Sequence, residues 1–316
     1  SKDSSYFRSF QFDGLHRTAT EIGQQNRLKE LATGIHLRYR GKQMEWSIAQ
    51  TITRWNYPFM PSNPLDWRGN VLMNTSLSYI RQFGNVRLSG EVAHAAPKAW
   101  ASIHAMSWAI NKKTDVSGII RVYQSGYFSP MANAISESSN NKNEWGLFLG
   151  HQYQRSKYQR ISSYIDIFQF PKASSSQWAS EKLGWELLSR FQWDRRKQGQ
   201  YFAQLKWTHK NLTSPTSPHD LYQGSIDWHK PLFRFEWHGR IMWTHIQSKE
   251  QNESGYLWLN DIEYHIKRFK VQVRTAWIWS GGTGSGANMM DFSHQPHKDL
   301  LTDFIDAIAS NRPPRV

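Results

Sequence analysis

The chain has 316 residues, of which 39% are hydrophobic, and its mean hydropathy is −0.69. No stretch approaches the roughly 18 consecutive apolar residues of a membrane-spanning helix, which excludes a helical membrane protein. The absence of cysteine excludes disulfides, thiolate metal sites and a cysteine nucleophile. A transmembrane β-barrel stays open as a fold class, because only every second residue of its strands must be apolar.

Aromatic residues and positive charge are both abundant. The chain contains 16 Trp, 13 Tyr and 16 Phe, and its net charge is +14. Amphipathic rings favour membrane interfaces, whereas sugar-stacking platforms and a sandwich core are the rival explanations. The charge suits lipopolysaccharide, anionic lipid or nucleic acid. Because the charges are spread over strands and turns, such as Arg195-Arg196-Lys197, we expect a solvated barrel wall and rim rather than a nucleic-acid patch.

The first third of the chain predicts strands after an irregular start. Residues 1–13 are expected to form an opening strand, and a capping box at residues 18–21 predicts a short helix or surface loop to about Leu31. Alternation begins at Gly34, and residues 56–70, with three prolines, are expected to form a loop.

Further strands are expected up to residue 170. Gly84-Asn85 predicts a tight hairpin turn between strands 71–83 and 86–94. Residues 95–111 could form a strand or a short helix, and we expect a strand because the neighbouring segments are strands. Strands are also predicted at 119–127, from Glu144 to about Tyr153, and at 160–170, with a polar loop at 136–143.

From Gly184 to Trp279 the alternation is regular. Trp185, Leu187, Phe191 and Trp193 share one parity, opposite Glu186, Arg190, Gln192 and Asp194. The same holds for Phe233, Phe235, Trp237, Ile241 and Trp243 against Arg234, Glu236, His238, Arg240 and Thr244, and for Phe269, Val271, Val273, Trp277 and Trp279 against Lys270, Gln272 and Arg274. Such alternation is typical of strands whose two faces meet different environments.

Short turns alternate with longer connections in this part of the chain. Turns are expected at Lys197-Gln198-Gly199 and Lys230-Pro231, and a long loop at 212–219. This alternation is typical of an up-and-down barrel. We therefore predict an all-β, antiparallel transmembrane barrel of about fourteen strands over residues 1–279, followed by a Gly-rich linker and a short terminal helix over 280–316.

Five stretches carry a resemblance to a known family. They are Gly14-Leu15-His16-Arg17-Thr18 with Glu21, Gly90-Glu91-Val92-Ala93, Arg121-Val122-Tyr123 with Tyr127, Asn143-Glu144-Trp145-Gly146 with Gly150, and Tyr164-Ile165-Asp166-Ile167-Phe168 before Pro171. In order and spacing they resemble the C-terminal half of the Bacteroidota outer-membrane β-barrel proteins that carry helix-hairpin-helix domains. The resemblance spans roughly residues 10 to 279, and the family's N-terminal region has no counterpart in the chain. It implies an outer-membrane location and a barrel that is part of a larger one.

The usual catalytic and metal-binding motifs do not occur. His209, His219, His229, His238 and His245 show no ligand spacing along the sequence, so no metal site is predicted. Residues 281–286 are Gly-rich, but Ala287 stands where a P-loop requires lysine. No Gly-x-Ser-x-Gly nucleophile elbow is found. We predict no catalytic residue, no cofactor and no enzymatic activity.

Acidic residues on the polar parity are the remaining candidates for chemistry. Glu186, Asp227, Glu236, Asp261 and Glu263 could face a lumen beside Arg190, Arg234, Arg240 and Arg274. Paired carboxylates can run acid–base chemistry, but salt bridges and water are the ordinary lining of a barrel. Asn143, Glu144 and Asp166 merit the closest attention, because they belong to the resemblance motifs and could fold inward turns.

The tryptophan positions offer a test of membrane girdles. Trp185 and Trp193, eight residues apart, would lie about 26 Å apart along a strand, which strand tilt shortens to roughly 20 Å along the membrane normal, close to a girdle spacing. Trp237 and Trp243, six apart, are expected to be too close to mark both girdles. We expect a non-enzymatic bacterial outer-membrane protein with a transport, assembly or scaffold role, in contact with lipid, lipopolysaccharide and other envelope proteins. DNA binding or uptake, an outer-membrane hydrolase and a soluble carbohydrate-binding β protein remain alternatives.

Overall fold

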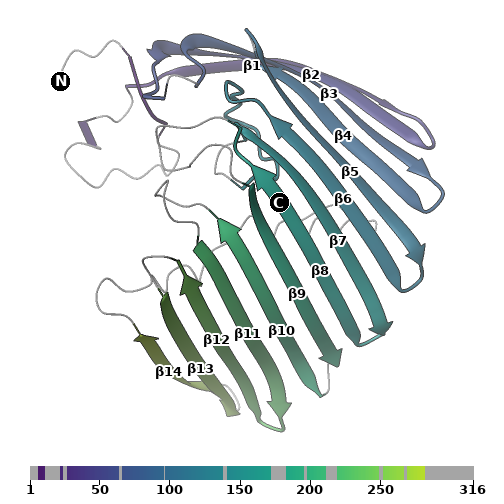
Figure 1. The fold of residues 1–316 in the computed structure, drawn as a ribbon, viewed down its shortest axis with the longest axis vertical. Coiled ribbons are helices and arrows are strands. Elements are labelled where there is room, and N and C mark those ends of the chain that lie inside the picture. The colour runs from purple at the N-terminus through teal and green to yellow at the C-terminus, as the bar shows by residue number, and fades with distance from the viewer. Residues whose placement is uncertain are drawn as a thin grey trace. The chain divides into compact units, whose positions relative to one another are not determined.

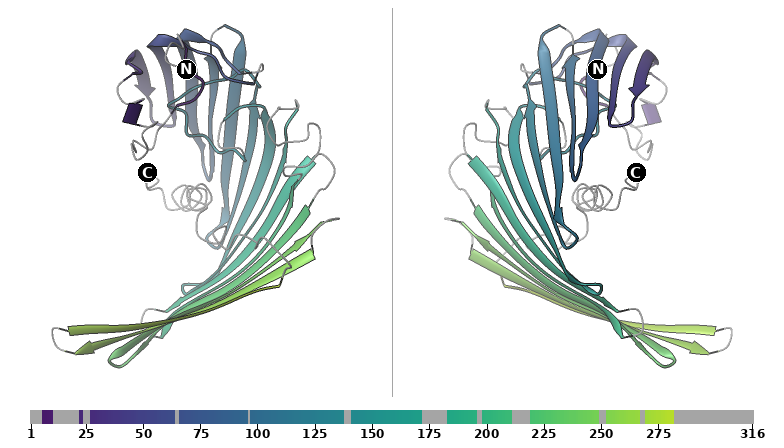
Figure 2. Two further views of the ribbon diagram at one scale, coloured as in Figure 1. Left: turned by 90° about the vertical axis from the view of Figure 1, so that its left-hand side faces the viewer. Right: turned by 90° about the vertical axis from the view of Figure 1, so that its right-hand side faces the viewer.

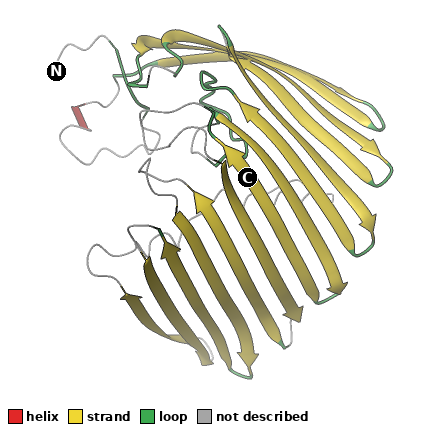
Figure 3. Cartoon of the chain, viewed as in Figure 1, coloured by secondary structure: helices red, strands yellow, loops and turns green. Residues whose placement is uncertain are grey.

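The computed structural model describes residues 6–10, 22–23, 27–63, 66–95, 97–137, 141–171, 183–195, 198–210, 219–248, 252–266 and 269–281. Most of this part is β-strand, and residues 22–23 are helical (Figure 3). None of the helices in the described ranges is long and apolar enough to cross a membrane. The predicted tail from residue 282 onward lies outside these ranges.

Fourteen strands form one antiparallel sheet. They are β1 (Glu30–Arg40), β2 (Met44–Phe59), β3 (Gly69–Phe83), β4 (Val86–Ala95), β5 (Ala99–Asn111), β6 (Thr114–Tyr123), β7 (Glu144–Ser156), β8 (Gln159–Gln169), β9 (Leu183–Arg195), β10 (Gly199–Lys210), β11 (His219–Leu232), β12 (Phe235–Gln247), β13 (Asn252–Ile266) and β14 (Phe269–Gly281). Each strand is hydrogen-bonded to the next in the chain, without a crossover (Figures 1 and 2). The order begins at β1 and ends at β14, which do not pair with each other in the described chain, so the sheet is an open meander rather than a closed barrel.

The predicted strand number is confirmed, and so is the strand, rather than helix, at β5. The Gly84-Asn85 turn is also confirmed, with Gly84 at a φ of 57°, where a side chain would be strained. Of the predicted opening strand, only residues 6–10 are described, and they contain a single bridge from Phe7 to Phe59. β1 begins at Glu30, before the predicted start at Gly34.

Three further predicted boundaries are wrong. The loop expected at 56–70 is shorter, because β2 continues to Phe59 through a register shift that absorbs its irregular end. The strand expected at 119–127 begins earlier and ends at Tyr123. The turn expected at Lys230-Pro231 lies instead at Phe233-Arg234, and Pro231 belongs to the end of β11, where proline is tolerated. Phe233, which was expected on the apolar face of a strand, occupies this turn with a φ of 57°.

The chain divides into two compact units. The first comprises Ser1–Met106, Ile120–Gly146 and Phe170–Ser176, and the second comprises Ser107–Ile119, Leu147–Gln169 and Gln177–Val316. Each unit is described separately below.

In the first unit, one face of β1, β2 and β3 carries exposed apolar side chains at every second position. They include Ile35, Leu37, Ile48, Ile52, Val71, Met73 and Leu77. The other face is covered by an aromatic cluster made of Trp55, Phe59 and Trp67 with the partly buried Phe7, Phe10 and Phe128. Because Trp55, Phe59 and Trp67 are buried, their rings pack a core and are not a free platform for sugar stacking.

In the second unit, the predicted separation of the two parities is confirmed by the strand registers. Leu187 of β9, Leu205 and Trp207 of β10, Ile226 of β11 and Ile241 of β12 lie on one face and are exposed. We call this the apolar face. The opposite, polar face carries buried Glu186, Lys206, Thr208, Thr244 and Glu263.

Two rows of aromatic rings cross the apolar face of the second unit. The first aromatic row follows contacts among Trp185, Trp207, Tyr222, His245 and Trp243, and continues with the contact of Tyr256 with Trp279. The second aromatic row contains the pairs Trp193–Tyr201, Trp228–Trp237 and Phe235–Tyr264. Trp237 and Trp243 thus belong to different rows, six residues apart on β12.

Candidate functional site

Glu144, one of the positions singled out in the sequence, is the centre of a buried polar network in the first unit. It is the first residue of β7, directly after Asn143, whose φ of 52° turns the chain into the strand. Its carboxylate accepts a hydrogen bond of 2.6 Å from Nε of Arg121 on β6, and both side chains are fully buried. Two motifs that are far apart in the sequence, Arg121-Val122-Tyr123 and Asn143-Glu144-Trp145-Gly146, therefore meet in one ion pair.

The same carboxylate holds part of the loop between β6 and β7. The hydroxyl of Ser136 donates to Oε2 of Glu144 over 2.9 Å, and the backbone N–H of Glu137 donates to both carboxylate oxygens. The phenol of Tyr123 donates to the carbonyl of Ile135 over 2.8 Å, one residue earlier in the loop. The expectation that Glu144 folds a turn onto the sheet agrees with these contacts.

Gly146 leaves the space that the guanidinium of Arg121 fills. A Cβ at position 146 would lie 2.3 Å from Cζ of Arg121, closer than any real contact. The glycine of this motif is therefore explained by packing. In the same loop, burial raises the pKa of the Tyr127 phenol above its ordinary value of 10.0.

Glu186 is the corresponding buried carboxylate in the second unit. It lies on β9 and accepts hydrogen bonds from the Tyr164 phenol on β8, over 2.5 Å, and from the Thr208 hydroxyl on β10, over 3.2 Å. Nζ of Lys206 lies 3.2 Å from the same carboxylate. A buried carboxylate costs several kcal/mol unless it is paired and hydrogen-bonded, and these contacts meet that requirement. Glu186 therefore joins three neighbouring strands.

Asp166 lies directly opposite Glu186 in the register of β8 and β9. Opposite positions place two Cβ atoms about 4.5–5.5 Å apart, so the structure does bring two carboxylates together, as a hydrolase would require. Both side chains are buried, however, and Glu186 is fully enclosed by its donors. A carboxylate in this state cannot touch a dissolved substrate without rearrangement, so the pair is better suited to holding strands together than to acid–base chemistry.

The other acidic residues singled out in the sequence form local ion pairs. Asp227 pairs with Arg240, Asp261 pairs with Arg274 over 2.6 Å, and Glu263 pairs with Lys270 over 2.6 Å. Arg190 donates to Gln204. These contacts match the salt-bridged polar face that was expected.

The histidines differ in their surroundings. His209 contacts Asp220 over 2.9 Å and stacks on Trp185, and His245 contacts the Ser254 hydroxyl over 2.9 Å. The His219 side chain lies outside the described residues. His229 and His238, in contrast, come together with Glu236, and the potential ligand atoms of these three residues all lie within 4.8 Å of one another. Sequence spacing missed this group, because it depends on the register of β11 and β12.

In the comparisons with known proteins, no family model and no curated protein matches this chain. The helix-hairpin-helix resemblance therefore remains an expectation that rests on its motifs.

Proposed function

We propose that the chain is part of a bacterial outer-membrane β-barrel with a non-enzymatic role in transport or assembly or as a surface scaffold. The observation that carries this proposal is the regular alternation of an exposed apolar face with a polar face across the second unit. An exposed apolar face of this extent is unfavourable in water and marks a surface that meets lipid or another apolar partner. Lipid facing one side and a hydrated lumen facing the other would account for both faces.

The two aromatic rows support a membrane environment in particular. Trp185 and Trp193 of β9 are eight residues apart, and Trp237 and Trp243 of β12 are six apart. At about 3.3 Å per residue the rows are separated by about 20–26 Å along the strands. Strand tilt shortens this to about 15–20 Å along the membrane normal, so the eight-residue pair of β9 approaches the apolar band of about 25 Å that aromatic girdles flank in outer-membrane barrels, and the six-residue pair of β12 supports it less. Lipid and lipopolysaccharide are the partners that this face would contact.

The free strand edges support a larger assembly. β1 pairs only with β2, and β14 only with β13, among the described residues. Unpaired backbone groups are costly in lipid, so both edges need partner strands there. We propose that further strands complete the barrel, supplied by the same protein or by an envelope partner.

The polar networks support a structural rather than a catalytic role for the polar face. Glu144 and Glu186 are enclosed by their donors, and Asp227, Asp261 and Glu263 pair with Arg240, Arg274 and Lys270. These contacts fix strands and one loop, as the lining of a barrel must. This structural use of the acidic residues supports a transport, assembly or surface-scaffold role for the completed protein over a catalytic one.

Membrane partitioning tests this proposal. The chain would be expressed behind a signal peptide, and the outer-membrane fraction would be washed with high salt and then with carbonate. Retention after both washes, with migration on a gel that changes on heating, is expected for an inserted barrel. Release as a folded β-rich protein would overturn the proposal and direct attention to sugar binding by exposed tryptophans such as Trp258 and Trp277.

A further inference from the structure

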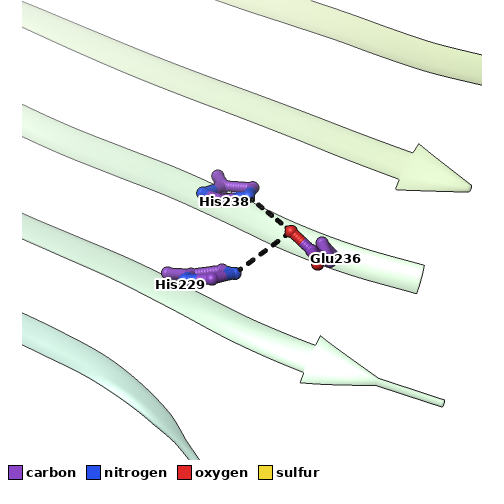
Figure 4. A group of neighbouring side chains, drawn as sticks. All are labelled: His229, Glu236 and His238. Carbon is purple, nitrogen blue, oxygen red and sulfur yellow. Dashed lines mark ion pairs between the residues drawn. The ribbon is translucent and has the colours of Figure 1, made fainter. Parts of the chain in front are cut away.

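The hairpin of β11 and β12 places two imidazoles and one carboxylate at one end of the polar face. His229 of β11 lies directly opposite His238 of β12, and Glu236 lies two residues before His238 on the same face. Figure 4 shows both imidazole rings directed at the Glu236 carboxylate. The rings are stacked, with centroids 4.0 Å apart and planes 7° from parallel.

The distances in this group do not fit hydrogen bonds. Nε2 of His229 lies 3.5 Å from Oε2 of Glu236, and Nε2 of His238 lies 3.6 Å from the same oxygen. A hydrogen bond of this kind would be about 2.7–3.2 Å long. Nε2 of His229 is moreover buried and lacks a hydrogen-bond partner in the described structure, which is an unfavourable state for a polar atom. The three residues are thus close together without satisfying one another.

The same distances fit ligands that share a metal ion. In a tetrahedral zinc site with bonds of about 2.0–2.1 Å, neighbouring ligand atoms lie about 3.3 Å apart. Both observed N–O separations are within a few tenths of an ångström of this value.

The surrounding charges leave Glu236 available for a cation. Nearby on the polar face, Asp227 pairs with Arg240, Asp261 with Arg274 and Glu263 with Lys270. Glu236, in contrast, has only the two histidines as ion-pair partners among the described residues. A divalent ion would therefore gain a carboxylate that need not be released from an arginine or lysine.

We propose that His229, His238 and Glu236 bind a divalent transition-metal ion of the zinc and copper class. Two imidazoles and one carboxylate suit these ions, whereas calcium and magnesium need a shell of oxygen ligands. Because one ion cannot lie in two parallel ring planes, the rings must tilt toward each other on binding. Their side chains are 34% and 42% exposed and have room to do so. Three protein ligands leave a fourth position for water, as in an open zinc site.

Calorimetric titration of the full chain in detergent micelles with Zn²⁺ alone tests the site. One ion is expected to bind per chain. His229→Gln and His238→Gln are each expected to weaken binding by at least tenfold, since each removes one ligand, while His209→Gln on β10 is the matched control and should change affinity less than twofold. Ca²⁺ should give no binding at the same concentrations. Far-ultraviolet circular dichroism confirms that each variant is folded.

Electron paramagnetic resonance with Cu²⁺ identifies the ligands directly. Hyperfine coupling to two nitrogens is expected for the unaltered chain and to one nitrogen in each of the two variants. The proposal is overturned if Zn²⁺ does not bind, or if binding and the two-nitrogen signal survive in both His229→Gln and His238→Gln. Neither outcome depends on membrane location, so this test and the partitioning test can fail independently.

Discussion

The substitution Ile226→Arg would distinguish a sheet that faces lipid from one that faces water. Ile226 lies on the apolar face of β11, between Tyr222 of the first aromatic row and Trp228 of the second, and is 53% exposed. In a bilayer, Ile226→Arg would bring a charge into the apolar band, at a cost of about 2–4 kcal/mol. This corresponds to a loss of about 30- to 700-fold in the folding equilibrium constant. In water, replacing such an exposed side chain would change stability by about 0.5 kcal/mol or less.

Leu232 provides the matched control. It lies on the same face of the same strand, six residues further on and next to the turn, and is 43% exposed. Because Leu232 is about 20 Å away along the strand and lies level with Phe235 of the second aromatic row, Leu232→Arg is expected to cost only about 0–1 kcal/mol.

Urea unfolding of the protein folded into lipid vesicles, followed by tryptophan fluorescence, measures both free energies. If Ile226→Arg and Leu232→Arg destabilise the protein equally, within about 0.5 kcal/mol, the apolar face does not lie in lipid and the reasoning fails.

Three further predictions concern the buried polar network and its loop. Arg121→Met removes the guanidinium that faces the buried Glu144 carboxylate and is expected to lower the free energy of chemical unfolding by about 3–5 kcal/mol. Adding Glu144→Gln to this variant should recover part of the loss. A loss below about 1 kcal/mol would contradict the stabilising role of the pair. Gly146→Ala forces a methyl group against Arg121 and is expected to lower the free energy of unfolding by about 1–3 kcal/mol. In the control Gly118→Ala, the new Cβ would meet Leu149 at an ordinary 3.6 Å, so the free energy of unfolding should change by no more than about 0.5 kcal/mol. Equal effects of the two variants would refute the packing argument. Folding raises the pKa of the Tyr127 phenol, so the folded state holds this proton more tightly than the unfolded state, and the stability gained is retained below about pH 10 and falls as the pH rises through the folded pKa. In Tyr127→Phe, the unfolding midpoint should lack this alkaline loss. An alkaline loss of the same size in Tyr127→Phe would contradict the role of the Tyr127 phenol.

The faces of the strands could be predicted from the sequence because a strand has a period of two. Trp185 and Glu186 had to lie on opposite faces wherever β9 was placed. The importance of Glu144 was suggested only by its motif. Its partner Arg121 lies on a different strand, and no local pattern predicts which residues of two strands face each other.

The His229, Glu236 and His238 group was missed because one turn was misplaced. In a two-residue hairpin, residues pair symmetrically about the turn, so a turn at Phe233-Arg234 pairs His229 with His238. A turn at Lys230-Pro231 would have paired His229 with Leu232 instead. The proline suggested the wrong position, since it was treated as a turn residue although it occupies the end of β11.

The meander has a consequence for the order in which the protein folds. Because every strand pairs with the next one in the chain, most pairings close only a short loop and require little chain entropy, and the longer connections between β6 and β7 and between β8 and β9 cost somewhat more. Hairpins can therefore form one after another, each serving as a template for the next. A slip of one residue would turn the tryptophans of that strand toward the polar side and the charges toward the apolar side. Each hairpin can thus reject a wrong register before the following strand is added.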